Sequence, residues 1–159
     1  MKKQVFIIGL VTALSGLFGC KDNTTDTTSN TQTNVQENAV KVGTLKKILE
    51  AFNKHDLDAI MEFFVEDCSF DFPRGPEPWG QRFTGKAQVR EAIAGRFKGM
   101  PDVQYEDEGH WVASDKGVSN WMLTGTTTAG VKVKVRICVL WEFLQDKVAR
   151  MDTYWKIME

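Results

Sequence analysis

The chain has 159 residues, with 20 lysines and arginines against 21 aspartates and glutamates, so its formal net charge is -1. This length suits one domain, and the balanced charge excludes the basic surface that nucleic-acid binding requires. A hydrophobic content of 42%, with five Trp and ten Phe, excludes a wholly disordered chain. Three Cys and two His without a Cys-x-x-Cys pair predict no metal site, and no motif for a cofactor occurs.

The first 20 residues have the pattern of a secretory signal. Lys2 and Lys3 precede an uncharged, mostly apolar run over 5–18, which is shorter than the about 20 residues of a membrane-spanning helix. The ending over 17–20 resembles the lipobox of bacterial lipoproteins. That resemblance implies that residues 1–19 are a removed signal peptide and that Cys20 is lipidated, which gives stable membrane attachment. We therefore predict a bacterial cell-envelope protein that is lipid-anchored and faces the extracytoplasmic side.

Residues 20–42 are dominated by Thr, Asn, Asp, Ser and Gln and contain no aromatic residue. Such a segment buries too little apolar surface to offset its ordering entropy. We therefore predict a flexible polar tether over 20–42 and a folded domain over 43–159, which holds every tryptophan.

The domain begins with helical periodicity. A stripe at Leu45, Ile48, Leu49 and Phe52 predicts an amphipathic helix that starts at a Thr44 cap. The polar run over 53–56 interrupts it, and a second stripe follows the Asp56 N-cap, so we predict either a broken helical hairpin or one kinked helix from 44 to about 65. A short strand over 68–72 and a Pro/Gly-rich loop over 73–80 follow. The pattern then predicts a helix over 86–98 and strands near 103–113, 117–127, 131–144 and 147–157.

This order is typical of an α+β domain with a mostly antiparallel sheet. In the strand over 131–144, one face is apolar throughout. The other face begins with Lys132, Lys134 and Arg136 and turns apolar at Cys138 and Leu140, which predicts a partner on that side. We expect Cys68 and Cys138 to be buried thiols rather than a disulfide.

Five stretches, 52–60, 72–75, 85–90, 121–126 and 141–148, resemble the SnoaL-like branch of the nuclear transport factor 2-like superfamily. The resemblance implies a cone-like barrel, in which a strongly curved, mostly antiparallel sheet wraps around N-terminal helices. It also implies a homodimer through the outer face of the sheet. The family includes steroid isomerases, cyclases, epoxide hydrolases, dehydratases and non-enzymes, so the fold does not fix an activity.

The catalytic positions of the family are mostly altered here. The isomerase-type base would immediately precede Pro73, where the chain has Phe72, with Asp71 one place away. At the last strand, Thr153 takes the place of an acid and Asp152 is its neighbour. Cyclase-like members use a His and an Asp, for which His110 and Asp71 are the candidates. The catalytic candidates are therefore His110, Asp71 and Asp152.

The aromatic residues favour an apolar pocket with a few polar groups. The ligand-binding candidates are Trp79, Trp121, Val139, Trp141, Thr153 and Trp155. We predict a membrane-anchored SnoaL-like domain that binds a small apolar or aromatic molecule in its cone. The alternatives are a cyclase-, isomerase- or dehydratase-type enzyme with an acid–base pair of His110 and Asp71, and a protein-interaction module. The sequence leaves open whether the protein is an enzyme.

Overall fold

The computed structural model describes residues 24–156, with side chains from residue 32 onward. The predicted signal peptide over 1–19 and Cys20 lie outside the described residues. The helices are α1 (Thr24–Asn53), α2 (Leu57–Glu62) and α3 (Lys86–Gly99). The strands are β1 (Phe64–Glu77), β2 (Gly80–Thr84), β3 (Gln104–Ala113), β4 (Lys116–Thr126), β5 (Lys132–Leu144) and β6 (Lys147–Trp155).

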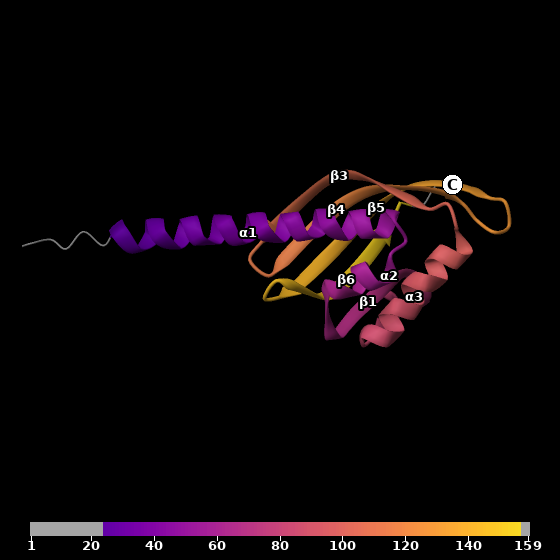
Figure 1. Cartoon of the computed structure of the whole chain (residues 1–159), viewed down its shortest axis with the longest axis horizontal. Helices are drawn as coiled ribbons and strands as arrows, with labels where there is room; N and C mark the ends of the chain where they lie inside the picture. The colour runs from indigo at the N-terminus through magenta and orange to yellow at the C-terminus, as the bar shows by residue number, and fades with distance from the viewer. Residues whose placement is uncertain (1–23, 157–159) are drawn as a thin grey trace, which may run out of the picture.

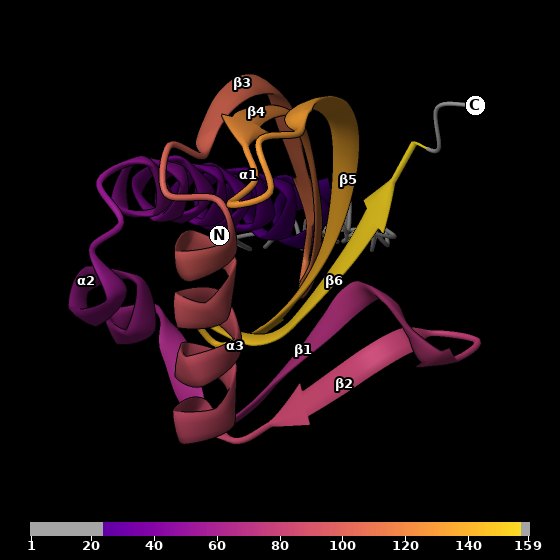
Figure 2. The ribbon, with the colours of Figure 1, turned by 90° about the vertical axis from the view of Figure 1, so that its right-hand side faces the viewer.

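The strands form one sheet in the order β2-β1-β6-β5-β4-β3. All neighbouring strands are antiparallel except β1 and β6, which are parallel. Figure 2 shows the sheet curving around the helices, with β2 and β3 as its two edges, so the sheet does not close. The predicted α+β cone with a mostly antiparallel sheet is confirmed.

All three helices lie on the concave side of the sheet, and α1 runs beyond the sheet at its N-terminal end (Figure 1). The predicted stripe of α1 is buried, with Leu45 and Ile48 fully enclosed. From the sheet, Trp121, Trp141 and Ile137 fill the same core. Because this apolar burial is the main favourable term in folding, it fixes the helices inside the curve.

Helix α1 begins at Thr24, so Thr44 lies inside the helix and does not cap it. The Nζ of Lys41 donates to the Ser114 carbonyl oxygen at 2.9 Å, and the Ser114 amide donates to Asn38 Oδ1 at 3.0 Å. The predicted domain boundary at residue 43 is therefore corrected, since at least Asn38 and Lys41 dock on the β3–β4 turn. The composition of this segment indicated a tether because the residues that dock are polar, so the sequence shows no apolar stripe there.

The predicted break after α1 is confirmed. His55 adopts a left-handed backbone with φ of 54°, and its ring stacks on Phe97 at 4.3 Å between centroids. Asp56 then caps α2, because its Oδ1 accepts a hydrogen bond from the Ala59 amide at 3.0 Å. This turn sets the direction in which the chain enters β1.

The predicted loop over 73–80 is wrong. Strand β1 continues to Glu77 and forms a hairpin with β2, with partners that run from Ser69↔Thr84 to Phe72↔Gln81. The pairing then shifts between Phe72 and Glu77, where Pro73 and Pro76 lack amide donors. The prolines therefore distort the hairpin instead of replacing it.

Candidate functional site

Register divides the predicted site residues between the two faces of the sheet. Asp71 pairs with Asp152, and the same row continues through Leu140 and Val118 to Trp111, which is exposed. Directly opposed residues share a face, so this row lies on the outer, convex side.

The neighbouring row points inward. It runs from His110 through Ser119 and Val139 to Thr153, all buried in the concave side. Asp71 and His110 therefore lie on opposite faces, and the predicted His110–Asp71 acid–base pair is wrong.

His110 belongs to a polar network inside the core. Its Nδ1 lies 2.7 Å from Ser119 Oγ, which also accepts a hydrogen bond from the Trp141 indole at 2.8 Å. Its Nε2 lies 3.3 Å from Asp107 Oδ2 but makes no well-aligned hydrogen bond. The side chain is 1% exposed. This network ties β3, β4 and β5 together, and His110 lines none of the cavities described below.

Acid should destabilise the fold through His110. Burial, aided by Lys46, lowers the pKa of His110 against the opposing effect of Asp107. Below the unfolded-state pKa of about 6.5 the unfolded chain takes up a proton that the folded chain resists, so stability falls as pH drops. We expect a loss of up to about 1 kcal/mol between neutral pH and pH 5.5, which chemical denaturation can measure. In His110→Gln this slope should flatten; an unchanged slope would contradict the assignment.

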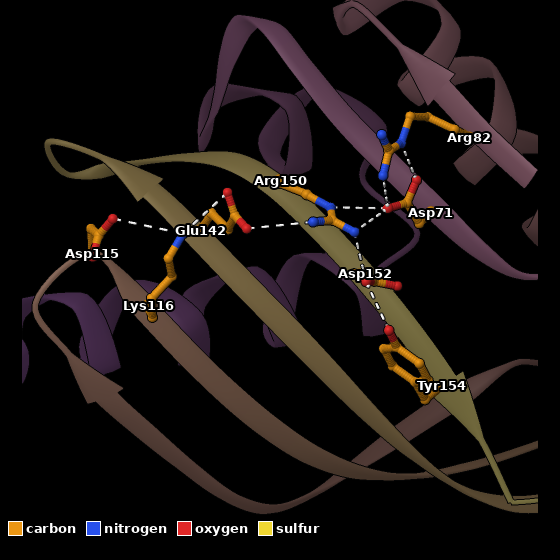
Figure 3. A network of polar contacts seen from close by, with 8 residues as sticks. All are labelled: Asp71, Arg82, Asp115, Lys116, Glu142, Arg150, Asp152 and Tyr154. Atoms are coloured by element: carbon orange, nitrogen blue, oxygen red, sulfur yellow. Dashed lines mark hydrogen bonds and ion pairs between the residues drawn. The ribbon is translucent and has the colours of Figure 1, made fainter. Parts of the chain in front are cut away.

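Asp71 is the centre of an ion-pair network on the outer face (Figure 3). Arg82 contacts its carboxylate in a bidentate manner at 2.6 and 2.7 Å, and Arg150 donates to Oδ2 at 2.7 and 2.9 Å. Burial opposes ionisation of Asp71, but the hydrogen bonds from both arginines outweigh it and hold the pKa of the carboxyl below its usual range. Asp71 is therefore a structural anion and not a proton acceptor.

Asp152 belongs to the same network. Its Oδ2 accepts hydrogen bonds from Arg150 at 2.8 Å and from Tyr154 at 3.1 Å. Burial raises the pKa of Asp152, and the nearby Asp71 charge adds to that effect. Arg150 also reaches Glu142, which pairs with Lys116, so the network crosses from β2 to β4. Both predicted carboxylates therefore connect strands on the outer face.

The interior of the cone contains a small cavity of about 10 Å³, the size of about one water molecule. It is lined by Phe52, Phe70, Ile93, Arg96, Tyr105, Trp121, Ile137, Met151 and Thr153. Two of its polar groups, the Trp121 indole N–H and the Thr153 hydroxyl, have no hydrogen-bond partner. The interior thus offers donors that the folded chain itself does not satisfy.

A larger groove opens beside this cavity, between α3, the β1–β2 hairpin and the end of β6. It has a volume of about 410 Å³ and is lined by Phe72, Gln81, Phe83, Ala92, Gly95, Arg96, Gly99, Met100 and Trp155. We call it the Arg96 groove, because Arg96 lines both the groove and the inner cavity. Its walls are mainly apolar and aromatic, as in most small-molecule sites.

A second groove also has Trp155 among its lining residues. This Trp79 groove has a volume of about 340 Å³ and is lined by Pro73, Arg74, Pro78, Trp79, Gly80 and residues 152–156. Trp79 is 52% exposed at its edge. Trp155 therefore lines both grooves.

The structure brings some of the predicted ligand-binding residues together and separates others. Trp121 and Thr153 line the inner cavity, Trp155 lines both grooves and Trp79 lines the second. Val139 and Trp141 are enclosed in the core and line none of these spaces. Sequence reasoning missed Arg96, although it lies seven residues after Val89 and thus on the apolar stripe of α3.

The profile of the SnoaL-like domain family matches residues 45–151. The chain belongs to this family. The match spans α2, α3 and most of the sheet, so it includes nearly all of the cone. No curated protein matches the sequence.

Solved structures share the fold of this SnoaL-like domain. A proposed polyketide cyclase from Xanthomonas campestris pv. campestris is 18% identical with a TM-score of 0.68, and the alignment covers 76% of this chain and 93% of the cyclase. A proposed isomerase from Bacillus subtilis is 21% identical with a TM-score of 0.63, covering 73% and 86%. TerC, co-crystallised with polyporic acid, is 16% identical with a TM-score of 0.65, covering 74% and 92%. At these identities the likeness establishes the fold alone.

Proposed function

We propose that this SnoaL-like domain binds a small, largely aromatic molecule in the Arg96 groove. The observation that carries the proposal is an aromatic groove that shares Arg96 with a cavity whose buried donors are unpaired. The likeness in fold to TerC, whose crystals contained polyporic acid, supports a planar cyclic ligand. An unpaired buried donor costs about 1–3 kcal/mol, so a ligand that satisfies one gains affinity.

Gly95 supports this placement of the ligand. It lies within α3, where a glycine is about 0.5–1 kcal/mol less stable than alanine. A Cβ atom at this position would meet no atom within 4 Å, so close packing does not require the glycine. Its absent side chain instead keeps the wall of the groove open.

Gly95→Phe should therefore block binding without unfolding the domain. The phenylalanine ring would project from the wall of the groove, so the affinity for 2-naphthamide, measured by saturable quenching of tryptophan fluorescence, should fall at least 10-fold. The thermal midpoint should stay the same or rise, because the helix loses a glycine. Gly43→Phe is the matched control, since Gly43 lies on α1 away from the groove and also has open space around it. Equal binding by both variants would contradict the proposed site.

The outer face is proposed as the dimer contact that the family resemblance predicts. Three apolar side chains are exposed there or at the rim: Trp111, Leu140 and Tyr154. They share this face with the Asp71 network, and an unpaired apolar surface of this kind favours association. Sedimentation velocity should give a mass of two chains, and Trp111→Asp should shift it towards one. A monomeric wild type would contradict the dimer and leave a protein-interaction role for this face.

Membrane attachment through Cys20 is also proposed, on the pattern of residues 1–20 alone. Among residues 24–156, no helix is long and apolar enough to cross a bilayer. We expect the expressed chain to incorporate an alkyne-tagged palmitate and to sediment with membranes of the bacterial envelope. Cys20→Ala should abolish the label, whereas Cys138→Ala should keep it. A label that persists in Cys20→Ala would contradict the lipidation site.

A further inference from the structure

We infer that the Arg96 groove selects an aromatic anion, whose acidic oxygens are held by Arg96 with support from Arg74. This inference rests on the proposed function and names the chemical class of its ligand. Four features of the groove support it: a cation without a counter-ion, a second cation nearby, hydrogen-bond donors without acceptors, and the different sizes of the groove and the inner cavity.

Arg96 extends from α3 between two aromatic rings. Its guanidinium carbon lies 4.5 Å from the centroid of Phe72 and 4.9 Å from that of Trp155. Stacking of this kind uses the flat face of the guanidinium. The Tyr105 phenol hydrogen-bonds to part of the N–H edge, which leaves the other N–H groups for a ligand. Burial lowers the pKa of Arg96 and the Tyr105 phenol opposes this effect, but a guanidinium stays charged at neutral pH.

The charge of Arg96 has no counter-ion in the folded chain. Across residues 32–156, no carboxylate forms an ion pair with it. The exposed Arg90 on the same helix, by contrast, pairs with Asp58 at 2.8 Å. Removing a cation from water and placing it among aromatic rings without an anion costs free energy, because no partner compensates for its lost hydration. An anionic ligand would supply the missing partner.

Arg74 adds a second positive charge. Its guanidinium carbon lies 5.5 Å from the centroid of the Trp155 ring, so the same ring contacts both arginines. Lys156 lines the Trp79 groove. The carboxylate that lines this groove, Asp152, is already engaged by Arg150 and Tyr154. The field at the mouth of the cone therefore favours a negative ligand.

The neutral polar groups favour the same ligand. The indole N–H groups of Trp121 and Trp155 can only donate, and the Thr153 hydroxyl also lacks a partner. These three groups and the Arg96 guanidinium offer hydrogen-bond donors to a ligand, and no free carboxylate of the described residues stands beside them as an acceptor. A carboxylate, enolate or phenolate oxygen accepts from such a set, whereas an amine or ammonium group would add further donors.

Space decides how the ligand lies. The inner cavity of about 10 Å³ has room for about one oxygen-sized group, whereas the groove of about 410 Å³ has room for a ring system. Arg96 borders both spaces. The acidic oxygens are therefore directed towards Arg96 and the cavity, and the ring packs against Phe72, Phe83 and Trp155.

Isothermal titration with two probes of equal shape tests the inference. The anionic probe is 2-naphthoate and the neutral probe is 2-naphthamide. We expect wild type to bind the naphthoate at least 10-fold more tightly. Arg96→Met keeps the apolar stem but should abolish this preference, Arg96→Lys should keep part of it, and Arg74→Met should reduce it. Arg90→Met is the matched control on the same helix and should leave the preference unchanged.

The outcomes separate this inference from the proposed function. Equal affinity of wild type for both probes overturns the anion selectivity while the aromatic groove stands. A naphthoate preference that persists in a folded Arg96→Met variant overturns the role of Arg96. Binding of neither probe overturns both the inference and the proposed site. The thermal midpoint of each variant shows whether it is folded, and Arg96→Lys provides the second reading if Arg96→Met is not.

Discussion

Asp71→Ala is expected to lower the free energy of unfolding by about 3 kcal/mol. The side chain is fully buried and accepts hydrogen bonds from both Arg82 and Arg150. Breaking a buried ion pair by removing one partner typically costs about 3–5 kcal/mol. The lower end applies here because both arginines keep part of their hydration, with 44% and 30% of their side chains exposed. Urea denaturation at neutral pH measures the change.

Asp58→Ala is the matched control for Asp71→Ala. Asp58 also pairs with an arginine, Arg90 at 2.8 Å, but its side chain is 87% exposed. Exposed pairs contribute little, so the free energy of unfolding should fall by about 0.5 kcal/mol or less.

Because the folded-state pKa of Asp71 is lowered, the stability that Asp71 contributes is present above the unfolded pKa of about 3.9 and is lost as pH falls through the folded value. Similar losses in the two variants at neutral pH would contradict the structural role of the network.

Gly80→Ala is expected to cost about 3 kcal/mol, near the upper end of the range for a strained backbone position. Gly80 has a φ of +86°, and a Cβ atom there would clash with the Phe72 carbonyl oxygen, only 1.9 Å away. The clash would separate β2 from β1 at the turn that carries Trp79. Chemical denaturation measures the stability, and the near-ultraviolet circular dichroism of the tryptophans reports the local change.

Gly130→Ala separates the two causes of that cost. Gly130 has a similar φ of +80°, but a Cβ atom there would meet nothing within 4 Å. Gly130→Ala should lower the free energy of unfolding by about 1 kcal/mol, from backbone strain alone. Equal losses at Gly80 and Gly130 would show that the close approach of β1 and β2 contributes nothing.

The periodic parts of the fold could be predicted from the sequence. Helix α3 and strands β3 to β6 have clear 3.6- and two-residue patterns, and Asp56 has the chemistry of an N-cap. The β1–β2 hairpin was missed because prolines and glycines usually mark a loop. They occupy instead the irregular end of the pairing, where Gly80 takes the strained position. The start of α1 was missed because its docking depends on Asn38 and Lys41, which are polar.

The candidate site could be predicted only in part. The aromatic content of the domain identified Trp121 and Trp155 as ligand-binding candidates, and the family resemblance identified Thr153. The structure places these residues at the inner cavity and the Arg96 groove. The His110–Asp71 pair was wrong because the face that each residue occupies depends on register through four intervening pairings, which no single strand reveals. Arg96 was missed because charged residues on a helix are usually solvated, although its place on the apolar stripe was visible in the sequence.

The indole N–H signals of the ¹⁵N-labelled protein, titrated with 2-naphthoate, test the central claim most directly. The five tryptophans lie at different places: Trp155 and Trp79 at the grooves, Trp121 at the cavity, Trp141 in the core and Trp111 on the outer face. Binding in the Arg96 groove predicts large shifts for Trp155 and Trp121, and little change for Trp111 and Trp141. Shifts at Trp111 without any at Trp155 would place the ligand on the outer face and contradict the proposed site.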